Sequence, residues 1–114
     1  MPRQCLPKRM KRRADFLRLA ATGRKTVKPG FVLQALQSEA GAGLVLGFTA
    51  TKKLGNAVVR NRAKRRLREA ARLVLAERAA TGAELVLIAR RETGAMDFAR
   101  LRRNLAVALD EVLA

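Results

Sequence analysis

The sequence lacks histidine, tryptophan and tyrosine and has a single cysteine, and these absences narrow the chemistry that its side chains can perform. Without histidine there is no Ser-His or Cys-His pair and no imidazole metal site. Cys5 alone builds neither a thiolate cage nor an internal disulfide, which fits a reducing cytoplasm. The carboxylates are scattered and form no catalytic motif. The sequence therefore predicts that the protein does not supply the reacting groups of a reaction.

Long apolar runs and acidic residues are also scarce. No apolar run approaches the ~20 residues of a membrane span, and no apolar region follows the N-terminal charges as it does in a secretory signal. We therefore expect a cytoplasmic protein. Nine Asp and Glu residues stand against 25 Lys and Arg residues, and the formal net charge is +16. So large a surplus repels itself, and it indicates a polyanionic partner: nucleic acid, a membrane surface or an acidic protein.

The length predicts one domain, residues 1–114, and 49% hydrophobic residues are enough for one core. The expected elements are a basic arm over 1–10, a helix over 11–21, a hairpin of strands over 31–37 and 44–50, a helix over 56–76, a strand over 84–90 and a helix over 97–113. Asn56 and Asp97 are the expected N-caps of the last two helices. A further short strand is expected around 49–52. This order predicts an α+β sandwich with one sheet.

The basic residues are concentrated in two segments. Residues 1–30 contain 10 of them, and residues 52–72 contain nine. Each of these segments contains one acidic residue, whereas residues 73–114 are balanced. The first helix and the central helix therefore carry the surplus, and we expect both on the same side of the protein.

The central helix separates into two sides when its residues are placed at about 100° per residue. One stripe is apolar and predicts the core side: Val59, Ala63, Leu67, Ala70 and Val74. A basic ridge lies beside it: Arg60, Asn61, Lys64, Arg65, Arg68 and Arg72, with Arg62 and Arg66 on the far flank. Arginine offers a planar fork of donors to phosphates. A basic helix is often only a solvated surface, but this run is long, one-sided and nearly free of acids, which favours polyanion binding.

Residues 52–69 also carry a specific motif. They read Lys-Lys-Leu-Gly-Asn-Ala-Val-Val-Arg-Asn-Arg-Ala-Lys-Arg-Arg-Leu-Arg-Glu, with Arg-Asn-Arg at residues 60–62. This segment resembles the signature of the bacterial ribonuclease P protein component. The resemblance extends along almost the whole chain, because an Asp-Phe pair at residues 15–16 lies in the first helix and a Leu-Val-Leu-Ile-Ala-Arg strand follows the signature.

The resemblance implies a fold and a function. The fold is an α/β sandwich in αβββαβα order, like domain 2 of ribosomal protein S5, with one mostly antiparallel sheet and a left-handed βαβ crossover. The implied partners are a large catalytic RNA, one protein per RNA, and precursor tRNA, with no membrane involved. The RNA removes the 5′ leader of precursor tRNA with Mg²⁺, and the protein is an accessory subunit without catalytic residues or metal ligands of its own.

The resemblance also assigns two groups of residues. The expected RNA-binding residues are Lys52, Lys53, Asn56, Arg60, Asn61, Arg62, Lys64, Arg65, Arg68 and Arg72. The expected leader-binding cleft, between the sheet and the first helix, contains Arg12, Arg13, Phe16 and Phe31. For Phe16 and Phe31, core packing is an equal alternative, and for Arg12 and Arg13 the equal alternative is a diffuse attraction by loosely ordered basic residues. The chain departs from the family at Ala20 and Gln34, where aromatic residues are common, so leader binding is expected to depend more on charge.

Three other functions compete with this interpretation. A structural RNA-binding protein, such as a ribosomal one, is excluded only by the motif at residues 52–69. A DNA-binding helix-turn-helix is disfavoured because no short helix and turn precede the central helix. A self-sufficient nuclease needs a carboxylate cluster or a histidine, and the sequence offers neither.

Overall fold

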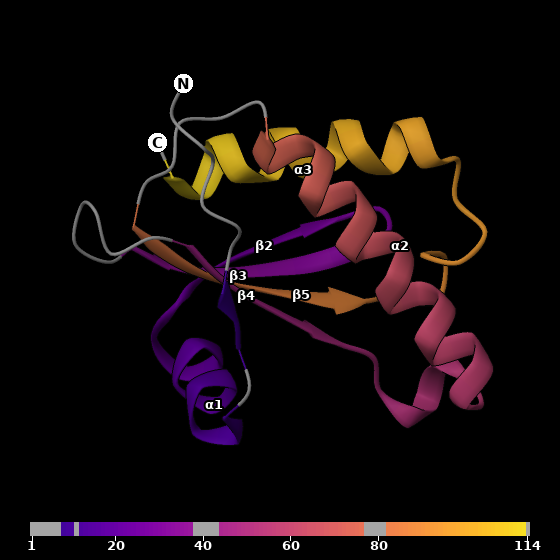
Figure 1. Ribbon diagram of the computed structural model, residues 1–114, viewed down its shortest axis with the longest axis horizontal. Coiled ribbons are helices and arrows are strands. Elements are labelled where there is room, and N and C mark those ends of the chain that lie inside the picture. The colour runs from indigo at the N-terminus through magenta and orange to yellow at the C-terminus, as the bar shows by residue number, and fades with distance from the viewer. Residues whose placement is uncertain (1–7, 11, 38–43, 77–81, 114) are drawn as a thin grey trace.

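The computed structural model describes residues 8–10, 12–37, 44–76 and 82–113 (Figure 1). Its elements are β1 (Lys8–Arg9), α1 (Arg13–Thr22), β2 (Arg24–Lys28), β3 (Phe31–Gln37), β4 (Leu44–Thr49), the 3-10 helix η1 (Lys52–Leu54), α2 (Ala57–Ala76), β5 (Ala83–Ala89) and α3 (Phe98–Leu113). Residues 1–7 of the expected arm and the turn expected over 38–43 lie outside the described residues. Residues 8 and 9 pair with β4 as a strand, so this part of the arm is not irregular.

The five strands form one mixed sheet in the order β1-β4-β5-β3-β2. β3 pairs antiparallel with both β2 and β5, whereas β4 pairs parallel with both β1 and β5. Among the four longer strands the antiparallel pairings are therefore in the majority, as the resemblance implies. The parallel neighbours β4 and β5 are joined through α2, which makes the βαβ unit; its left-handed sense stays a prediction. The α+β class and the αβββαβα order are confirmed, with β1 added in front.

Two details of the predicted sheet are wrong. The strands over 31–37 and 44–50 do not form a hairpin, because β5 lies between β3 and β4. β5 takes the central place because its apolar residues are buried or half-buried on both faces. The hairpin partner of β3 is β2, which residue patterning missed since it is basic and mostly exposed. The strand expected around 49–52 is absent; Thr49 ends β4 and η1 begins at Lys52.

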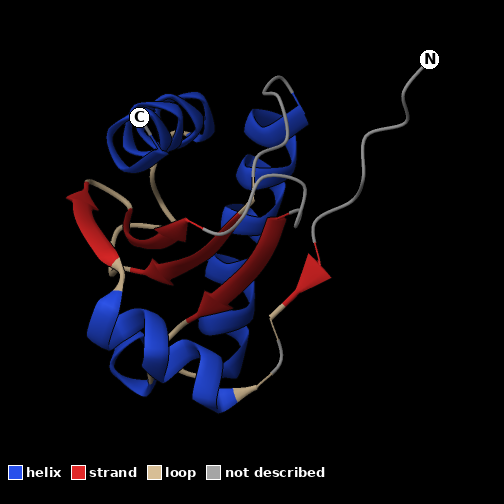
Figure 2. Cartoon of the chain, turned by 90° about the vertical axis from the view of Figure 1, so that its left-hand side faces the viewer, coloured by secondary structure: helices blue, strands red, loops and turns tan. Residues whose placement is uncertain are grey.

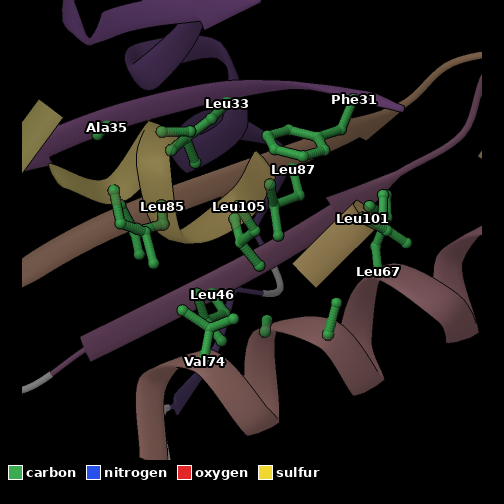
Figure 3. Packing of buried hydrophobic residues seen from close by; sticks show 14 of the residues in the cluster. Phe31, Leu33, Ala35, Leu46, Leu67, Val74, Leu85, Leu87, Leu101 and Leu105 are labelled. Atoms are coloured by element: carbon green, nitrogen blue, oxygen red, sulfur yellow. The ribbon is translucent and has the colours of Figure 1, made fainter. Parts of the chain in front are cut away.

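The sheet separates two layers of unequal size. α2 and α3 cover one face, and α1 lies on the other, with the sheet between them (Figure 2). On the α2/α3 side the core is large: Leu67 and Val74 from α2 and Leu101 and Leu105 from α3 point toward the sheet (Figure 3). On the α1 side a small cluster forms around Met10, Leu19 and Val86. The first and central helices therefore lie on opposite faces, contrary to expectation.

The predicted ends of the long helices are confirmed. Asn56 Oδ1 accepts the Val59 amide at 3.0 Å, and Asp97 Oδ2 accepts the Arg100 amide at 3.1 Å, as N-caps do. The predicted core stripe of α2 holds from Ala63 onward. Val59 is an exception, with 44% of its surface exposed. It lies in the first turn of α2, which extends beyond the ends of the strands (Figure 1), and it lies against Gly55 rather than against the sheet.

Candidate nucleic-acid interface

The basic side of α2 faces solvent along most of its length. Asn61, Arg62 and Arg65 are exposed, and Lys64 is half-buried. Within the described residues, none of these four side chains takes part in an ion pair or a hydrogen bond. Their donors are therefore available to an anionic partner.

Arg60 has an unusual environment on the same helix. Its side chain is half-buried, and its Nε is buried without a hydrogen-bond partner among the described residues. A buried donor without a partner is destabilising. A phosphate or water that reaches this guanidinium would remove that cost, which strengthens Arg60 as a binding residue.

Three other arginines of α2 contact the protein itself. Arg72 pairs with Glu69 one turn away, which raises the pKa of Arg72 and lowers that of Glu69 below its ordinary value. The Arg68 guanidinium carbon lies 5.6 Å from the centroid of the Phe48 ring. Arg66 contacts the loop between β5 and α3 through two backbone carbonyls. The basic side of α2 is thus a mixture of free and internally bound cations, which the helical wheel does not distinguish.

The turn before α2 extends the basic surface. Lys52 and Lys53 lie in η1, which is separated from β4 by two residues, and both are exposed. Gly55 follows with φ of +146°, a conformation that side chains rarely adopt. It lets the chain turn sharply so that Asn56 caps α2. The two lysines are thereby held next to the N-terminus of α2, where the helix dipole also favours anions.

The sheet face that carries α1 has a row of partly exposed side chains. The strand register aligns Val27 with Val32, Val32 with Ile88, and Ile88 with Thr49, so one row crosses β2, β3, β5 and β4. Val27 is 55% exposed, and the other three are half-buried. We call these four residues the open row. Sequence patterning missed it because β2 was not predicted, although the alternation in β5 already places Ile88 opposite the main core.

Phe16 lies beside the open row, and Phe31 does not. Phe16 is half-buried on α1, and a Cβ placed on Gly47 would be only 2.6 Å from its Cε1 atom, so the ring lies directly over that glycine. Phe31 is fully buried among α2 and α3 side chains on the opposite face. The expectation that Phe31 lines the α1 side is therefore wrong, because residues alternate between faces along β3. The core-packing alternative is confirmed for Phe31.

The remaining cleft candidates differ in their surroundings. Arg12 and Arg13 are exposed at the start of α1, one turn before Phe16. Gln34 is on the α1 side of β3, next to Val86, and only 6% of its surface is exposed. Ala20 is exposed on α1. The two positions where the chain departs from the family thus differ. Gln34 is a buried polar residue under α1, whereas Ala20 is a small residue at the surface.

α1 is held on the sheet by one strong polar contact besides its small apolar cluster. Arg18 donates to both Glu84 oxygens, at 2.6 and 2.8 Å, and to Asp15 at 3.3 Å. The hydrogen bonds to Glu84 and then to Asp15 raise the pKa of Arg18 above its ordinary value. The pattern of residues missed this bidentate pair because its members are 66 positions apart. It fixes α1 over β5 and leaves Arg18 already neutralised.

Two kinds of site are missing from the described part of the chain. No group of three or more Asp, Glu, His or Cys side chains there could hold a metal ion. None of the described helices combines the length and the apolar character that crossing a bilayer requires.

Comparisons with known proteins agree with this geometry. The family model for Ribonuclease P matches residues 5–113. The chain is 54% identical over 93 residues to the ribonuclease P protein component of Gluconacetobacter diazotrophicus, covering 82% of this chain and 80% of that protein. It is 46% identical over 111 residues to the component from Paramagnetospirillum magneticum, covering 91% and 81%.

Solved structures of similar shape have the same description. The RNase P protein from Thermotoga maritima superposes with a TM-score of 0.77 at 28% identity, covering 92% of this chain and 97% of that one. The Staphylococcus aureus RNase P protein gives a TM-score of 0.75 at 27% identity, covering 96% of this chain and all of that one.

Proposed function

This chain belongs to the ribonuclease P protein family, and from that premise we propose that it binds the catalytic RNA of ribonuclease P and the 5′ leader of precursor tRNA. Family membership gives it a role in maturation of the tRNA 5′ end as the protein component of the enzyme. Each RNA is proposed to contact a different surface of the protein. One protein binds each catalytic RNA in the cytoplasm, and the RNA performs the cleavage.

The RNA subunit is assigned to the N-terminal half of α2 and the turn before it. This assignment rests on a group of side chains there that have no hydrogen bond or ion pair among the described residues. They are Lys52, Lys53, Asn61, Arg62, Lys64 and Arg65, with the half-buried Arg60 beside them. Arginine forks suit phosphates, and Asn61 suits a 2′-hydroxyl or a base edge. Asn56 is assigned to this surface through its place at the helix start. Arg68 and Arg72 are assigned weaker contacts, because the protein already holds them.

The leader is assigned to the open row, with Phe16 at its side and Arg12 and Arg13 one turn before Phe16. Partly exposed apolar side chains next to cations suit a single strand, whose bases offer apolar faces and whose backbone is anionic. Since Phe31 is buried on the other face, Phe16 is the aromatic residue of the proposed site. An aromatic stack contributes roughly 1–3 kcal/mol per base. Because Ala20 and Gln34 stand where aromatic residues are common in the family, this site has less stacking, and charge has a larger share of leader binding.

The physical mechanism is charge neutralisation. The catalytic RNA and precursor tRNA are both polyanions, and they repel each other when they meet. A protein of net charge +16 that contacts the RNA subunit with α2 and the leader with the opposite sheet face reduces that repulsion. The complex then forms at lower Mg²⁺ concentration. The Mg²⁺ ions are assigned to the RNA, and the described residues of the protein include no group of three or more side chains that could hold a metal ion.

Reconstitution tests this function. Purified protein and the catalytic RNA are mixed at low Mg²⁺, and cleavage of precursor tRNA is compared with that by the RNA alone. We expect the protein to accelerate cleavage at low Mg²⁺ and to matter less as Mg²⁺ rises, since the cation also neutralises phosphates. An RNA that cleaves equally well with and without the protein at every Mg²⁺ concentration contradicts the proposal.

A further inference from the structure

Arg66 is a basic residue of α2 that points into the protein rather than toward a ligand. Its Nε donates to the Thr93 carbonyl at 3.1 Å, and its Nη2 donates to the Met96 carbonyl. Its guanidinium carbon also lies 5.6 Å from the centroid of the Phe98 ring, the first residue of α3. One side chain thus contacts the middle of the loop between β5 and α3 and the end of the loop next to α3.

The same loop is joined to the turn between β2 and β3. Thr93 is fully buried; its Oγ1 donates to the Gly30 carbonyl and accepts the Arg90 amide at 2.8 Å. Glu92 Oε2 accepts the Gly30 amide at 3.1 Å. Gly30 has φ of +100°, and a Cβ there would be 2.8 Å from a Leu101 methyl group, so this turn is packed tightly against α3. The loop is therefore held by two sets of contacts. Thr93 and Glu92 bind it to the turn between β2 and β3, and Arg66 binds it to α2.

The loop also connects the two proposed RNA surfaces. Arg90 follows Ile88 of the open row by two residues, and its Nη1 donates to the Lys28 carbonyl at 3.4 Å. Arg91 is exposed next to it. On α2, Arg62 is one turn before Arg66 and on the same flank. Movement of the loop would therefore change the distance between the cations near the open row and the cations of α2.

We propose that Arg66 is a positioning residue, which holds the β5–α3 loop and its two arginines in place for precursor tRNA without contacting RNA itself. This inference rests on the proposed function, which it extends. It requires a guanidinium, because two carbonyls and an aromatic face are satisfied together by a planar fork of donors. Lysine keeps the charge but has no such fork.

Three variants separate the roles of charge and geometry. Arg66→Leu removes both, Arg66→Lys keeps the charge, and Arg65→Leu removes a charge from the neighbouring exposed position. The first readout is hydrogen exchange of the Thr93, Ala95 and Met96 amides, which bond to carbonyls within the loop. The second is the affinity for the RNA subunit at several salt concentrations. The third is KM and kcat of the reconstituted enzyme for precursor tRNA.

We expect the loop amides to exchange about tenfold faster in both Arg66 variants, as the loss of a charge-assisted hydrogen bond implies. Exchange at Leu87 in the centre of the sheet should not change. The salt dependence of RNA-subunit binding should be unchanged in the Arg66 variants, whereas it should weaken in Arg65→Leu. KM for precursor tRNA should rise in the Arg66 variants at constant kcat, which a general loss of folded protein would not produce.

Two results would overturn the inference. One is a normal loop in Arg66→Leu together with a weaker salt dependence, which would make Arg66 an RNA contact. The other is a loop that exchanges faster with no change in KM, which would make its role purely structural. If Arg66→Leu does not fold, Arg66→Lys supplies the same comparison. A failure of the proposed function can be told apart from a failure of this inference, because in that case even the unchanged protein would not accelerate cleavage.

Discussion

The double change Arg62→Ala and Arg65→Ala should weaken binding of the RNA subunit in a manner that depends steeply on salt. Both side chains are exposed on the same stretch of α2, and neither has a hydrogen bond or an ion pair within the part of the chain that the structure describes. Their removal therefore breaks no hydrogen bond or ion pair within that part of the chain. Any loss of affinity then reports on contacts with RNA.

The magnitude follows from counterion release. Each phosphate contact contributes about 0.9 to the slope of log affinity against log salt on a duplex, and about 0.7 on a single strand. Two lost contacts lower the slope by roughly 1.4 to 1.8. Over a fourfold rise in salt, from about 50 to 200 mM, the unchanged protein should therefore lose about tenfold more affinity than the variant loses.

The assay is equilibrium binding of labelled catalytic RNA at five or six salt concentrations, with fixed Mg²⁺. The matched control is Arg100→Ala with Arg103→Ala, which removes the same charge from exposed positions on α3. The control should keep the original slope, because α3 is outside the proposed interface. Equal slopes for the two double variants would refute the assignment of the RNA to α2 and leave only a diffuse attraction by net charge.

Three predictions concern the framework around the two surfaces. Gly47→Ala should lower the free energy of unfolding by about 1–3 kcal/mol, because its Cβ would meet the Phe16 ring; a Phe16→Leu change added to it should recover part of that loss in urea unfolding. Asn56→Ala should cost about 1 kcal/mol by thermal or urea unfolding, as the loss of an N-cap does, whereas Asn56→Ser should cost little. The Gly30 amide, and next the backbone amide of Glu92 itself, lower the pKa of the Glu92 carboxyl from its ordinary value of 4.5. The stability that this carboxylate supplies is thus complete above that value and lost as pH falls through the lowered pKa, so Glu92→Gln should destabilise the protein at neutral pH and progressively less below pH 4.5. A difference in urea midpoint that stays constant down to pH 3 would contradict the last of these.

Much of the local structure could be predicted because local rules govern it. The strand over 31–37 matches β3, and the helices that follow Asn56 and Asp97 begin where their caps predict. Side-chain caps, apolar periodicity and the motif at residues 52–69 are each contained within one continuous segment of the chain, so they can be read without knowing how segments pack together. The lack of histidine and of a second cysteine was equally visible from composition, and it favours binding over catalysis by the protein's own side chains.

The candidate site was predictable only in outline. The basic side of α2 was visible on a wheel, but which arginines are free depends on what lies opposite them. Arg66 meets two carbonyls of a loop that begins 24 positions later, and no periodicity in α2 indicates this. Phe31 and Phe16 were equivalent candidates in the sequence, and the faces of the sheet separated them.

The sequence by itself determined that this is a basic chain with a guanidinium-rich helix, because charge, cap residues and apolar spacing are properties of the chain alone. The tertiary structure decided that β5 lies between β3 and β4, that α1 and α2 occupy opposite faces, and that the two proposed RNA surfaces are separated by the sheet. The physical reason is that strand order depends on which strand can bury both of its faces. The sequence of a strand indicates how apolar it is, but only the packed molecule shows which helices and strands cover its two faces.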